Sequence, residues 1–244
     1  MHAPVHFARP VTRSRLHENI VSVILKKIIK KELRCGERLP SERNLALSFD
    51  VNRSTIREAL KKLESLDVIE IRHGDGVYVK DYLESGNLEL IQALFYMDNS
   101  LDEDILWTLL EVRRVLVPEM VSIAALNRTG EDLEKLSDLV FQSMDLSTME
   151  RDIRIHHRIA LASKNILYLI LLNFFTKFFR QFGHIYFDKE ENRLRSETFH
   201  QDILRAIRDR DQAAAKQIML DVLTYVEHAI RTVLDERNHI QERT

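Results

Sequence analysis

Residues 38–80 read RLPSERNLALSFDVNRSTIREALKKLESLDVIEIRHGDGVYVK, and their pattern decides the fold of the first part of the chain. Ser41 can cap a first helix, whose apolar residues recur at helical spacing. Asp50-Val51-Asn52 breaks that pattern, and a second helix is predicted to begin near Asn52. Two short helices joined by so tight a turn predict a helix-turn-helix.

The outer, N-terminal side of the second predicted helix carries basic and hydroxyl side chains. These are Arg53, Ser54, Thr55 and Arg57. The same part of a recognition helix faces base edges and phosphates in the major groove. Two strands, Val68–Arg72 and Val77–Lys80, are predicted next, and glycines at positions 74 and 76 permit a tight turn between them. The hairpin would form a wing, so the stretch predicts contact with double-stranded DNA.

The net charge of −2 hides an uneven distribution along the chain. Residues 1–81 hold 16 Lys and Arg against 11 Asp and Glu, a balance of +5. Residues 82–244 hold 20 against 27, a balance of −7. A basic head on an acidic body is expected when only the head meets phosphate.

Three separated segments, LPSERNLA, VNRSTIREAL and RHGDGVYV, resemble in order and spacing the winged helix-turn-helix of the GntR family of bacterial transcriptional regulators. The resemblance covers residues 12–81 and implies a set of DNA contacts. They are Arg43, Arg53, Ser54, Thr55, Arg57 and, at the wing tip, His73 and Gly74. Arg43 and Arg53 are expected to reach bases, because a guanidinium can bond guanine through two hydrogen bonds. The other recognition-helix residues are expected to hold phosphates.

The rest of the chain is patterned as helix almost throughout. Apolar spacing predicts helices over 88–97, 101–126, 130–144, 151–162, 166–182, 190–208 and 212–237, with Pro118 kinking or splitting the second. The predicted fold class is mainly α: an N-terminal winged helix-turn-helix with a small β-hairpin wing, then an antiparallel all-helical bundle of six or seven helices. The predicted divisions are a flexible N-terminus (1–11), the winged helix-turn-helix (12–81), a linker (82–87), the helical domain (88–237) and a C-terminal tail (238–244).

Composition indicates the cellular compartment in which the chain is expected to work. Its one cysteine, Cys35, cannot form an internal disulfide, which favours a reducing cytoplasm. The first twenty residues are charged and lack the apolar core of a signal peptide. The longest apolar run, Ile166–Leu172, is too short to span a bilayer. We therefore expect a cytoplasmic protein without a membrane partner.

Asp152 and His156 lie four residues apart, on one face of a predicted helix, and His200 lies on a later helix. One carboxylate and two imidazoles suit a divalent metal such as Zn, Ni or Mn. The same three side chains also suit a hydrogen-bonded polar pair or a solvated face.

The helical domain resembles the effector-binding and dimerisation domain of the FadR subgroup within the GntR family. The resemblance rests on EVRR (111–114), ASKN (162–165), FH (199–200) and RAIRDRDQAAAKQIM (205–219). Many members hold a metal through one Asp and three His, and Asp152, His156 and His200 fall on three of these positions. The fourth falls on Val222, which cannot ligate. Such a site would need water, an effector, Asp221 or His184 to complete it, or it has been lost.

The resemblance implies one of two effector types. Metal-holding members bind small organic acids, and Arg113 matches the arginine that engages the carboxylate. The fatty-acid-responsive branch instead takes acyl-coenzyme A, and this chain is similar to it in ILYLILLNFF and GHIYFDKEENRL. Aromatic side chains from these segments would then line an acyl tunnel, or else form ordinary core: Phe174, Phe175, Phe178, Phe179, Phe182, Tyr186 and Phe187.

These features together predict a conditional DNA-binding regulator and not an enzyme. A homodimer about a twofold axis would place two recognition helices on a palindromic operator, and an effector near Arg113, Asp152, His156 and His200 would alter DNA affinity. One rival is a metal-dependent enzyme built on Asp152, His156 and His200, although no HExxH motif or nucleophile elbow accompanies them. The other is a protein-interaction module whose basic head is structural.

Overall fold

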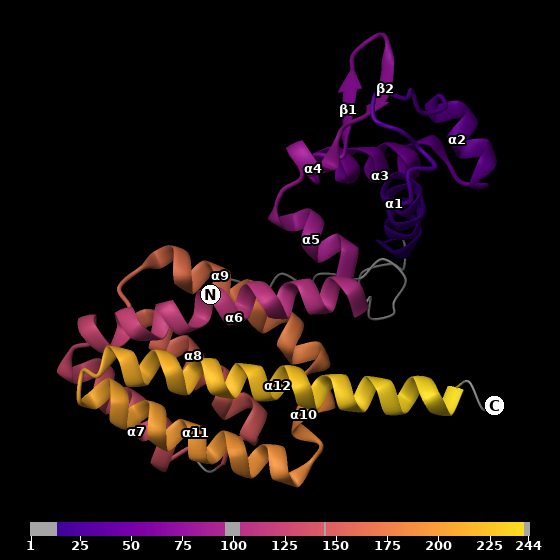
Figure 1. Ribbon diagram of the computed structural model, residues 1–244. Coiled ribbons are helices and arrows are strands. Elements are labelled where there is room, and N and C mark those ends of the chain that lie inside the picture. Colours follow the sequence, from indigo (N-terminus) through magenta and orange to yellow (C-terminus); the bar gives the residue numbers. More distant parts are fainter. Residues whose placement is uncertain (1–13, 96–102, 144, 242–244) are drawn as a thin grey trace, which may run out of the picture. The chain divides into compact units, whose positions relative to one another are not determined.

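The computed structural model describes residues 14–95, 103–143 and 145–241, which contain twelve helices and one two-stranded sheet (Figure 1). The predicted fold class, mainly α with a β-hairpin wing and a C-terminal helical domain, is confirmed. The chain divides into two compact units between Leu106 and Trp107. The predicted flexible N-terminus, 1–11, lies outside the described residues. None of the described helices has the length and apolar character needed to cross a bilayer.

The first unit is built from five helices and the hairpin. Its elements are α1 (Ser14–Ile29), α2 (Glu42–Ser48), α3 (Arg53–Ser65), β1 (Ile69–Arg72), β2 (Gly76–Val79), α4 (Tyr82–Ser85) and α5 (Leu88–Phe95). Helix α3 packs against both α1 and α2. Ile56, Leu60 and Leu63, one face of α3, are fully buried in the core of this unit. The apolar spacing of α3 thus places its opposite face at the surface.

Side-chain caps fix where the two helices of the helix-turn-helix begin. The Ser41 hydroxyl accepts a hydrogen bond from the Asn44 amide at 3.3 Å, as the sequence predicts. The Asn52 side chain caps α3 by accepting from the Thr55 amide at 2.8 Å. Between them, Asp50 adopts a positive φ of 50°, which turns the chain sharply.

The wing is an antiparallel hairpin with a three-residue turn. Ile69 pairs with Val79, and Arg72 pairs with Gly76. Gly74 takes the positive φ of 79° that the turn requires. Gly76 has a different role, because a Cβ there would lie 2.5 Å from Nε of Arg38. A side chain at position 76 would therefore push the Arg38 guanidinium off the wing.

The segment after the wing packs on the first unit. The stretch expected as a linker, 82–87, contains the short helix α4. Leu90 of α5 is buried in the same core as α3. The Asn87 amide donates to the Ser65 carbonyl at 2.8 Å, and Lys62 pairs with Glu89 at 2.9 Å. Residues 88–95, expected in the second domain, are thus fastened to the first unit.

The second unit is a bundle of helices with one large apolar core. The helices are α6 (Glu103–Asn127, which begins in the first unit), α7 (Gly130–Phe141), α8 (Thr148–Ala162), α9 (Ile166–Phe182), α10 (His184–Phe187), α11 (Glu190–Arg208) and α12 (Gln212–Gln241). Helix α8 packs against α7, α9 and α11, and α11 packs against α12. Helix α6 runs along α12, to which Arg114 is joined by an ion pair with Glu227 at 3.3 Å (Figure 1).

Three features of the bundle differ from the sequence pattern. Helix α6 is not split at Pro118, where a kink or a split was expected. Val117 and Met120, the neighbours of Pro118 on α6, are buried in the core, and this packing holds the helix together despite the missing amide. The short helix α10 was not predicted, because four residues are too few to show a periodicity. Helix α12 extends to Gln241, into the stretch expected as a tail.

Candidate DNA-reading surface and effector site

The hydroxyl groups at the start of α3 are engaged in capping the helix. Ser54 donates to the Asn52 side-chain oxygen at 2.7 Å, and Thr55 donates to the same oxygen at 2.9 Å. Both hydroxyls still have lone pairs, but their protons are used. They can therefore reach a phosphate as donors only after leaving Asn52.

The three predicted arginines of this surface fall into two classes. Arg57 pairs with Glu42 of α2 at 2.8 Å, which joins the two helices of the helix-turn-helix. Arg43 and Arg53 are exposed and have no ion pair among the residues described. These two guanidiniums are free to bond a partner without breaking an internal contact.

The wing tip contains a cluster that the sequence reasoning missed. The Arg72 guanidinium lies 4.3 Å from the ring centre of Tyr78, whose hydroxyl donates to Asp75 at 3.0 Å. Arg38 donates to the Asp75 carbonyl and also faces the Tyr78 ring. His73 and Gly74, the predicted contacts, are exposed beside this cluster. In the sequence, the only signal for this cluster was the presence of basic and aromatic residues on facing strands of the hairpin.

Within the second unit, the structure brings together the predicted Asp152, His156 and His200. All three are buried. His200 Nε2 lies 3.0 Å from Asp152 Oδ1, and His156 Nδ1 lies 3.4 Å from Asp152 Oδ2. His156 Nδ1 also donates to the backbone carbonyl of Asp152 at 3.0 Å. Because Nδ1 holds the proton, Nε2 of His156 is a buried acceptor, and it has no hydrogen-bond partner among the described residues.

The charges of this cluster depend on one another. Burial acts to raise the pKa of Asp152, but the neighbouring imidazoles and Arg113 outweigh it and keep that pKa below its usual value. Burial lowers the pKa of His156, which favours the neutral imidazole. Asp152 is thus an ionised carboxylate between a neutral His156 and a hydrogen-bonded His200.

Arg113 of α6 is buried in the same region, with only 9% of its surface exposed. Its guanidinium lies 5.4 Å from the ring centre of Phe179, on α9. Burial lowers the pKa of Arg113, against the attraction of Asp152 and Glu227. A buried guanidinium that lies over an aromatic ring and forms no ion pair with a described residue is suited to hold an anion.

A second group of buried polar side chains, missed from the sequence, supports the cluster. The Asn192 amide donates to the Tyr186 carbonyl at 2.8 Å and accepts from the Tyr225 hydroxyl at 3.0 Å. Burial raises the pKa of Tyr186 to about 12. Asn192 and Ser196 precede His200 on α11 at intervals of four residues, so all three lie on one face of the helix. This spacing was the sequence signal from which the group could have been predicted.

The residues present do not fit the divalent metal considered from the sequence. Val222 is buried in the apolar core and offers no donor. Asp221 is exposed and bonded by Gln217 at 2.8 Å, and His184 is exposed, so neither completes the set. Among the described residues, no three His, Cys, Asp or Glu side chains are grouped so that they could hold a metal ion.

The side chains next to the cluster have different surroundings. His157 lies on the outer face of α8, with Arg154 and Arg158. The aromatic side chains of α9 and α10 pack on one another: Phe179 and Tyr186 both lie edge-on to Phe187, at 5.8 and 5.0 Å. These are the contacts of an ordinary aromatic core. The side chain of Phe182 lies outside what the structure describes.

Comparison with known proteins gives two family matches. Residues 16–79 match the family of bacterial regulatory proteins named gntR, and residues 108–225 match the FCD domain. The first match contains the helix-turn-helix and the wing. The second contains Arg113, Asp152, His156, His200 and Val222. Both groups of candidate residues thus lie inside matched domains.

Similar proteins are named as transcriptional regulators. The regulator LutR of Bacillus subtilis is 31% identical over 215 residues, which cover 84% of this chain and 96% of LutR. The regulator Mce2R of Mycobacterium tuberculosis is 35% identical over 53% of this chain, and the match spans about half of Mce2R, 54%. The fatty acid metabolism regulator of Shewanella pealeana is 25% identical, with 80% of this chain and 82% of that protein covered.

The fold also matches solved structures. The structure of Lar, a protein described as controlling the expression of the Listeria monocytogenes agr system, aligns with a TM-score of 0.55 at 18% identity. The alignment covers 93% of this chain and 99% of that one, so the similarity in fold spans both units. The family matches and relatives are regulatory proteins, and none of them supports a metal-dependent enzyme. The chain belongs to the GntR family of bacterial regulatory proteins, with an FCD domain as its C-terminal module.

Proposed function

We propose that this chain is a sequence-specific DNA-binding transcriptional regulator whose affinity for its operator is set by a small organic acid bound in the FCD domain. The observation that carries the DNA-binding half is the pair of exposed, unpaired guanidiniums of Arg43 and Arg53 at the starts of α2 and α3. Each can bond the O6 and N7 atoms of a guanine without losing an internal ion pair.

The other residues of the surface would position the protein on the DNA backbone. Arg57 would keep the ion pair of its Nε with Glu42 and donate from its other guanidinium nitrogens to a phosphate. Ser54 and Thr55 lie at the positively charged end of the helix dipole, where a phosphate is favoured. His73 and Gly74 at the wing tip would approach the minor groove or its phosphates.

A homodimer would place two such surfaces on one operator. Two recognition helices related by a twofold axis read half-sites that are inverted copies of each other, about one turn of DNA apart. The operator is therefore proposed to be palindromic. The dimer would have two conformations that hold its DNA-binding heads differently. An effector bound in the helical domain would alter DNA affinity only if these two conformations bind the effector with different affinities.

The effector site proposed here works without a metal. The buried Arg113 would hold the carboxylate of the effector, with Asp152 and His200 fixing the floor of the site. The unpartnered Nε2 of His156 would accept a hydrogen bond from a hydroxyl group of the effector. This pair of groups favours a hydroxy acid over a plain carboxylic acid or an acyl thioester.

The DNA-binding half is tested by fluorescence anisotropy on DNA that flanks the gene. Replacing Arg53 with alanine should weaken binding of the operator by about 1–3 kcal/mol, a factor of about 5 to 150, and reduce discrimination against shuffled DNA. Lys61→Ala, an exposed change on the far half of α3, is the matched control. Full sequence-specific binding by an Arg43→Ala, Arg53→Ala double variant would contradict the proposal.

The effector half is tested by calorimetry with matched acids. Glycolate and malate should bind more tightly than acetate and succinate, which lack the hydroxyl, because a site built around a hydrogen bond rejects the analogue without it. Arg113→Lys should weaken all four acids, whereas His156→Phe should remove only the preference for the hydroxyl. Binding of a fatty acyl thioester but none of these acids would contradict this half and leave the DNA-binding half intact.

A further inference from the structure

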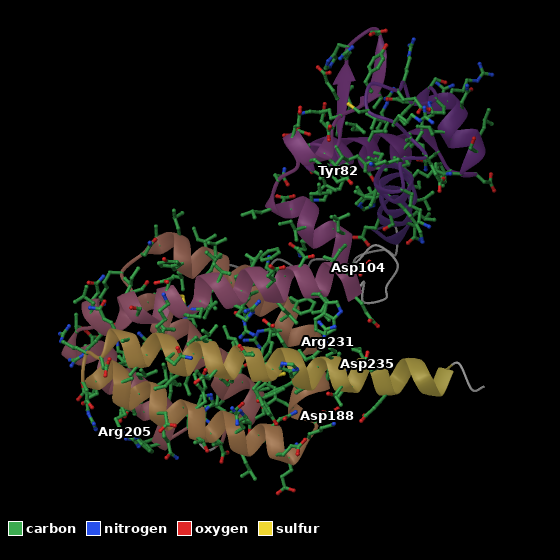
Figure 2. The ribbon with its side chains drawn as sticks, in the orientation of Figure 1. Tyr82, Asp104, Asp188, Arg205, Arg231 and Asp235 are labelled. Carbon is green, nitrogen blue, oxygen red and sulfur yellow. The ribbon has the colours of Figure 1, made fainter. Side chains whose placement is uncertain are left out.

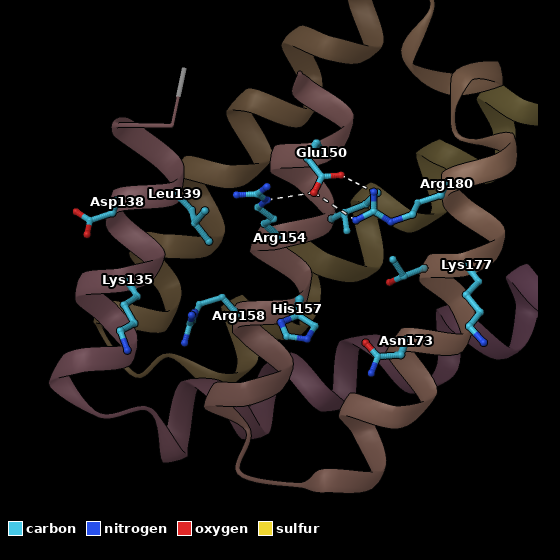
Figure 3. Close-up of a pocket in the computed structure, with 12 residues that line it drawn as sticks. Lys135, Asp138, Leu139, Glu150, Arg154, His157, Arg158, Asn173, Lys177 and Arg180 are labelled. Atoms are coloured by element: carbon cyan, nitrogen blue, oxygen red, sulfur yellow. Dashed lines mark hydrogen bonds and ion pairs between the residues drawn. The ribbon is translucent and has the colours of Figure 1, made fainter. Parts of the chain in front are cut away.

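A groove of about 920 Å³ lies on the outer side of the FCD domain, lined by α7, α8 and α9. Figure 3 shows Lys135 and Asp138 on one wall, Arg154 and Arg158 from the central helix, and Lys177 on the other wall. Each helix contributes residues three or four positions apart, so one continuous face of each helix lines the groove. The proposed effector site does not use this space.

The groove and the buried cluster lie on opposite sides of α8. Asp152 and His156 are buried and point into the bundle. Arg154 and Arg158, each two residues further along, project into the groove instead. A helix advances about 100° per residue, so positions two apart face in nearly opposite directions. A ligand in the groove would therefore be held by a different set of side chains from the organic acid.

The groove is more positive than the domain that carries it. Residues 107–244 hold 20 Lys and Arg against 21 Asp and Glu, a balance of −1, whereas five cationic side chains and only two carboxylates line the groove, a balance of +3. The cations are Lys135, Arg154, Arg158, Lys177 and Arg180, and the carboxylates are Asp138 and Glu150. Such a concentration of one sign in a concave surface attracts anions of the opposite sign.

Internal ion pairs leave two of these cations free. Glu150 binds Arg154 at 3.1 Å and Arg180 at 2.6 Å, which fixes two guanidiniums across the groove. Lys135 pairs with Glu131 on its own helix. Arg158 and Lys177, from α8 and α9, have no ion pair among the residues that the structure describes. The groove thus holds two uncompensated charges on adjoining helices.

The remaining lining suits a ligand with both charged and neutral parts. Asn173 and Thr176 offer hydrogen-bonding groups near Lys177, and Leu139 and Ile153 provide apolar surface. The volume lies in the range of pockets that hold small organic ligands. One carboxylate would balance only one of the two uncompensated cations, whereas a diphosphate ester carries about −3 and offers several oxygens to a guanidinium.

We propose that this groove binds a small molecule bearing a diphosphate, as a second ligand separate from the organic acid. Arg158 and Lys177 bind the phosphates, and the pair of Arg154 and Arg180 held by Glu150 keeps the groove open and positive. The neutral part of the ligand lies along Asn173 and Thr176. The FCD domain would thereby respond to two chemically different signals.

Calorimetry on the full chain at low ionic strength tests this proposal with ADP, inorganic pyrophosphate, adenosine and citrate. ADP and pyrophosphate should bind, and adenosine should not. Arg158→Glu and Lys177→Glu should each weaken ADP by about tenfold or more, as expected for a lost charge-assisted hydrogen bond. Arg205→Glu, at an exposed position of α11 outside the groove (labelled in Figure 2), should leave binding unchanged.

Three results would overturn the proposal. In the first, both groove variants bind ADP as tightly as the wild-type chain does. In the second, citrate binds as tightly as pyrophosphate. In the third, duplex DNA binds to the groove and small phosphates do not. Circular dichroism of each variant confirms that it is folded. Arg113→Lys should leave ADP binding unchanged, so a failure of the organic-acid site is distinguishable from a failure of the groove.

Discussion

The polar side chains of the two units are used in opposite ways. On the DNA-reading surface, Arg43 and Arg53 are exposed and unpaired. In the FCD domain, Asp152, His156 and His200 are buried and bonded mainly to one another. A free surface charge can be changed with little effect on folding, whereas a buried bonded charge cannot. The head should therefore lose binding on substitution, and the bundle should lose stability.

The largest expected effect is the loss of the central carboxylate of the bundle. Asp152→Ala leaves the buried His200 Nε2 without its carboxylate partner and removes one of the two carboxylates that attract the buried Arg113. We expect the free energy of unfolding of the FCD domain to fall by about 3–5 kcal/mol. Urea unfolding followed by fluorescence of Trp107, the one tryptophan, reports on this domain.

The matched control is a carboxylate on the surface of the same bundle. Asp202 of α11 pairs with Arg205 at 3.2 Å, and both side chains are well exposed. Asp202→Ala should change the unfolding free energy by less than about 0.5 kcal/mol. Equal losses in the two variants would remove the distinction between buried and exposed charge.

The second prediction turns the buried cluster into a metal site. Val222→His places an imidazole in a packed core and should cost about 1–3 kcal/mol without metal. With three imidazoles and Asp152 available, zinc or nickel should restore the melting temperature. Val226→His, a buried valine one turn later on α12, should lose stability without a metal response. A rise in the melting temperature of the wild-type chain on addition of metal would contradict the conclusion that the cluster, with Val222 at the fourth ligand position, does not hold a metal.

A smaller loss of stability is expected where the start of α7 meets the turn between α8 and α9. Asp132 forms a capping box with Thr129 and pairs with Lys164. Asp132→Asn weakens both the capping box and the ion pair, and should lower the free energy of unfolding by about 1 kcal/mol. Partial burial acts to raise the pKa of Asp132, but Lys164 and Thr129 outweigh it and bring that pKa to about 2.

The direction of this shift fixes the pH dependence. A depressed carboxylate pKa stabilises the fold above the unfolded value of 3.8, and the contribution disappears as the pH falls towards 2. The difference in unfolding free energy between wild type and Asp132→Asn should be constant from pH 5 to 7 and shrink below about pH 4. Denaturant unfolding at a series of pH values measures it, and a difference that stays constant down to pH 3 would argue against the ion pair.

The smallest effect is expected at the wing. Tyr78→Phe removes the hydrogen bond to Asp75 but keeps the ring against Arg72. DNA affinity, measured by anisotropy, should fall by no more than about threefold, because one exposed hydrogen bond contributes little. A loss beyond tenfold would mean that the Tyr78 hydroxyl itself contacts DNA.

Local rules account for what the sequence predicted well. The cap at Ser41, the start of a helix near Asn52, the two strands and the face of α3 each depend on residues close together in the chain. The long helices were predicted because several turns repeat the same apolar spacing. Family resemblance then placed Asp152 and His200 together, although they are far apart in sequence.

Long-range packing accounts for what the sequence could not predict. The apolar face of α5 shows that it is buried but not against which unit, so the attachment of Leu90 to the head was missed. Pro118 has a local penalty that the core around α6 outweighs. The groove beside Arg158 and Lys177 exists only because three helices from different parts of the sequence meet there.

The position of the one cysteine gives the molecule a ready spectroscopic label. Cys35 is exposed and lies beside the base of the wing, next to Gly36, whose amide donates to the Val79 carbonyl at 2.8 Å. A thiol-reactive dye would attach at one defined place in each chain, close to the DNA-reading surface. In a dimer, energy transfer between two such dyes would measure the separation of the two heads directly, with and without each ligand.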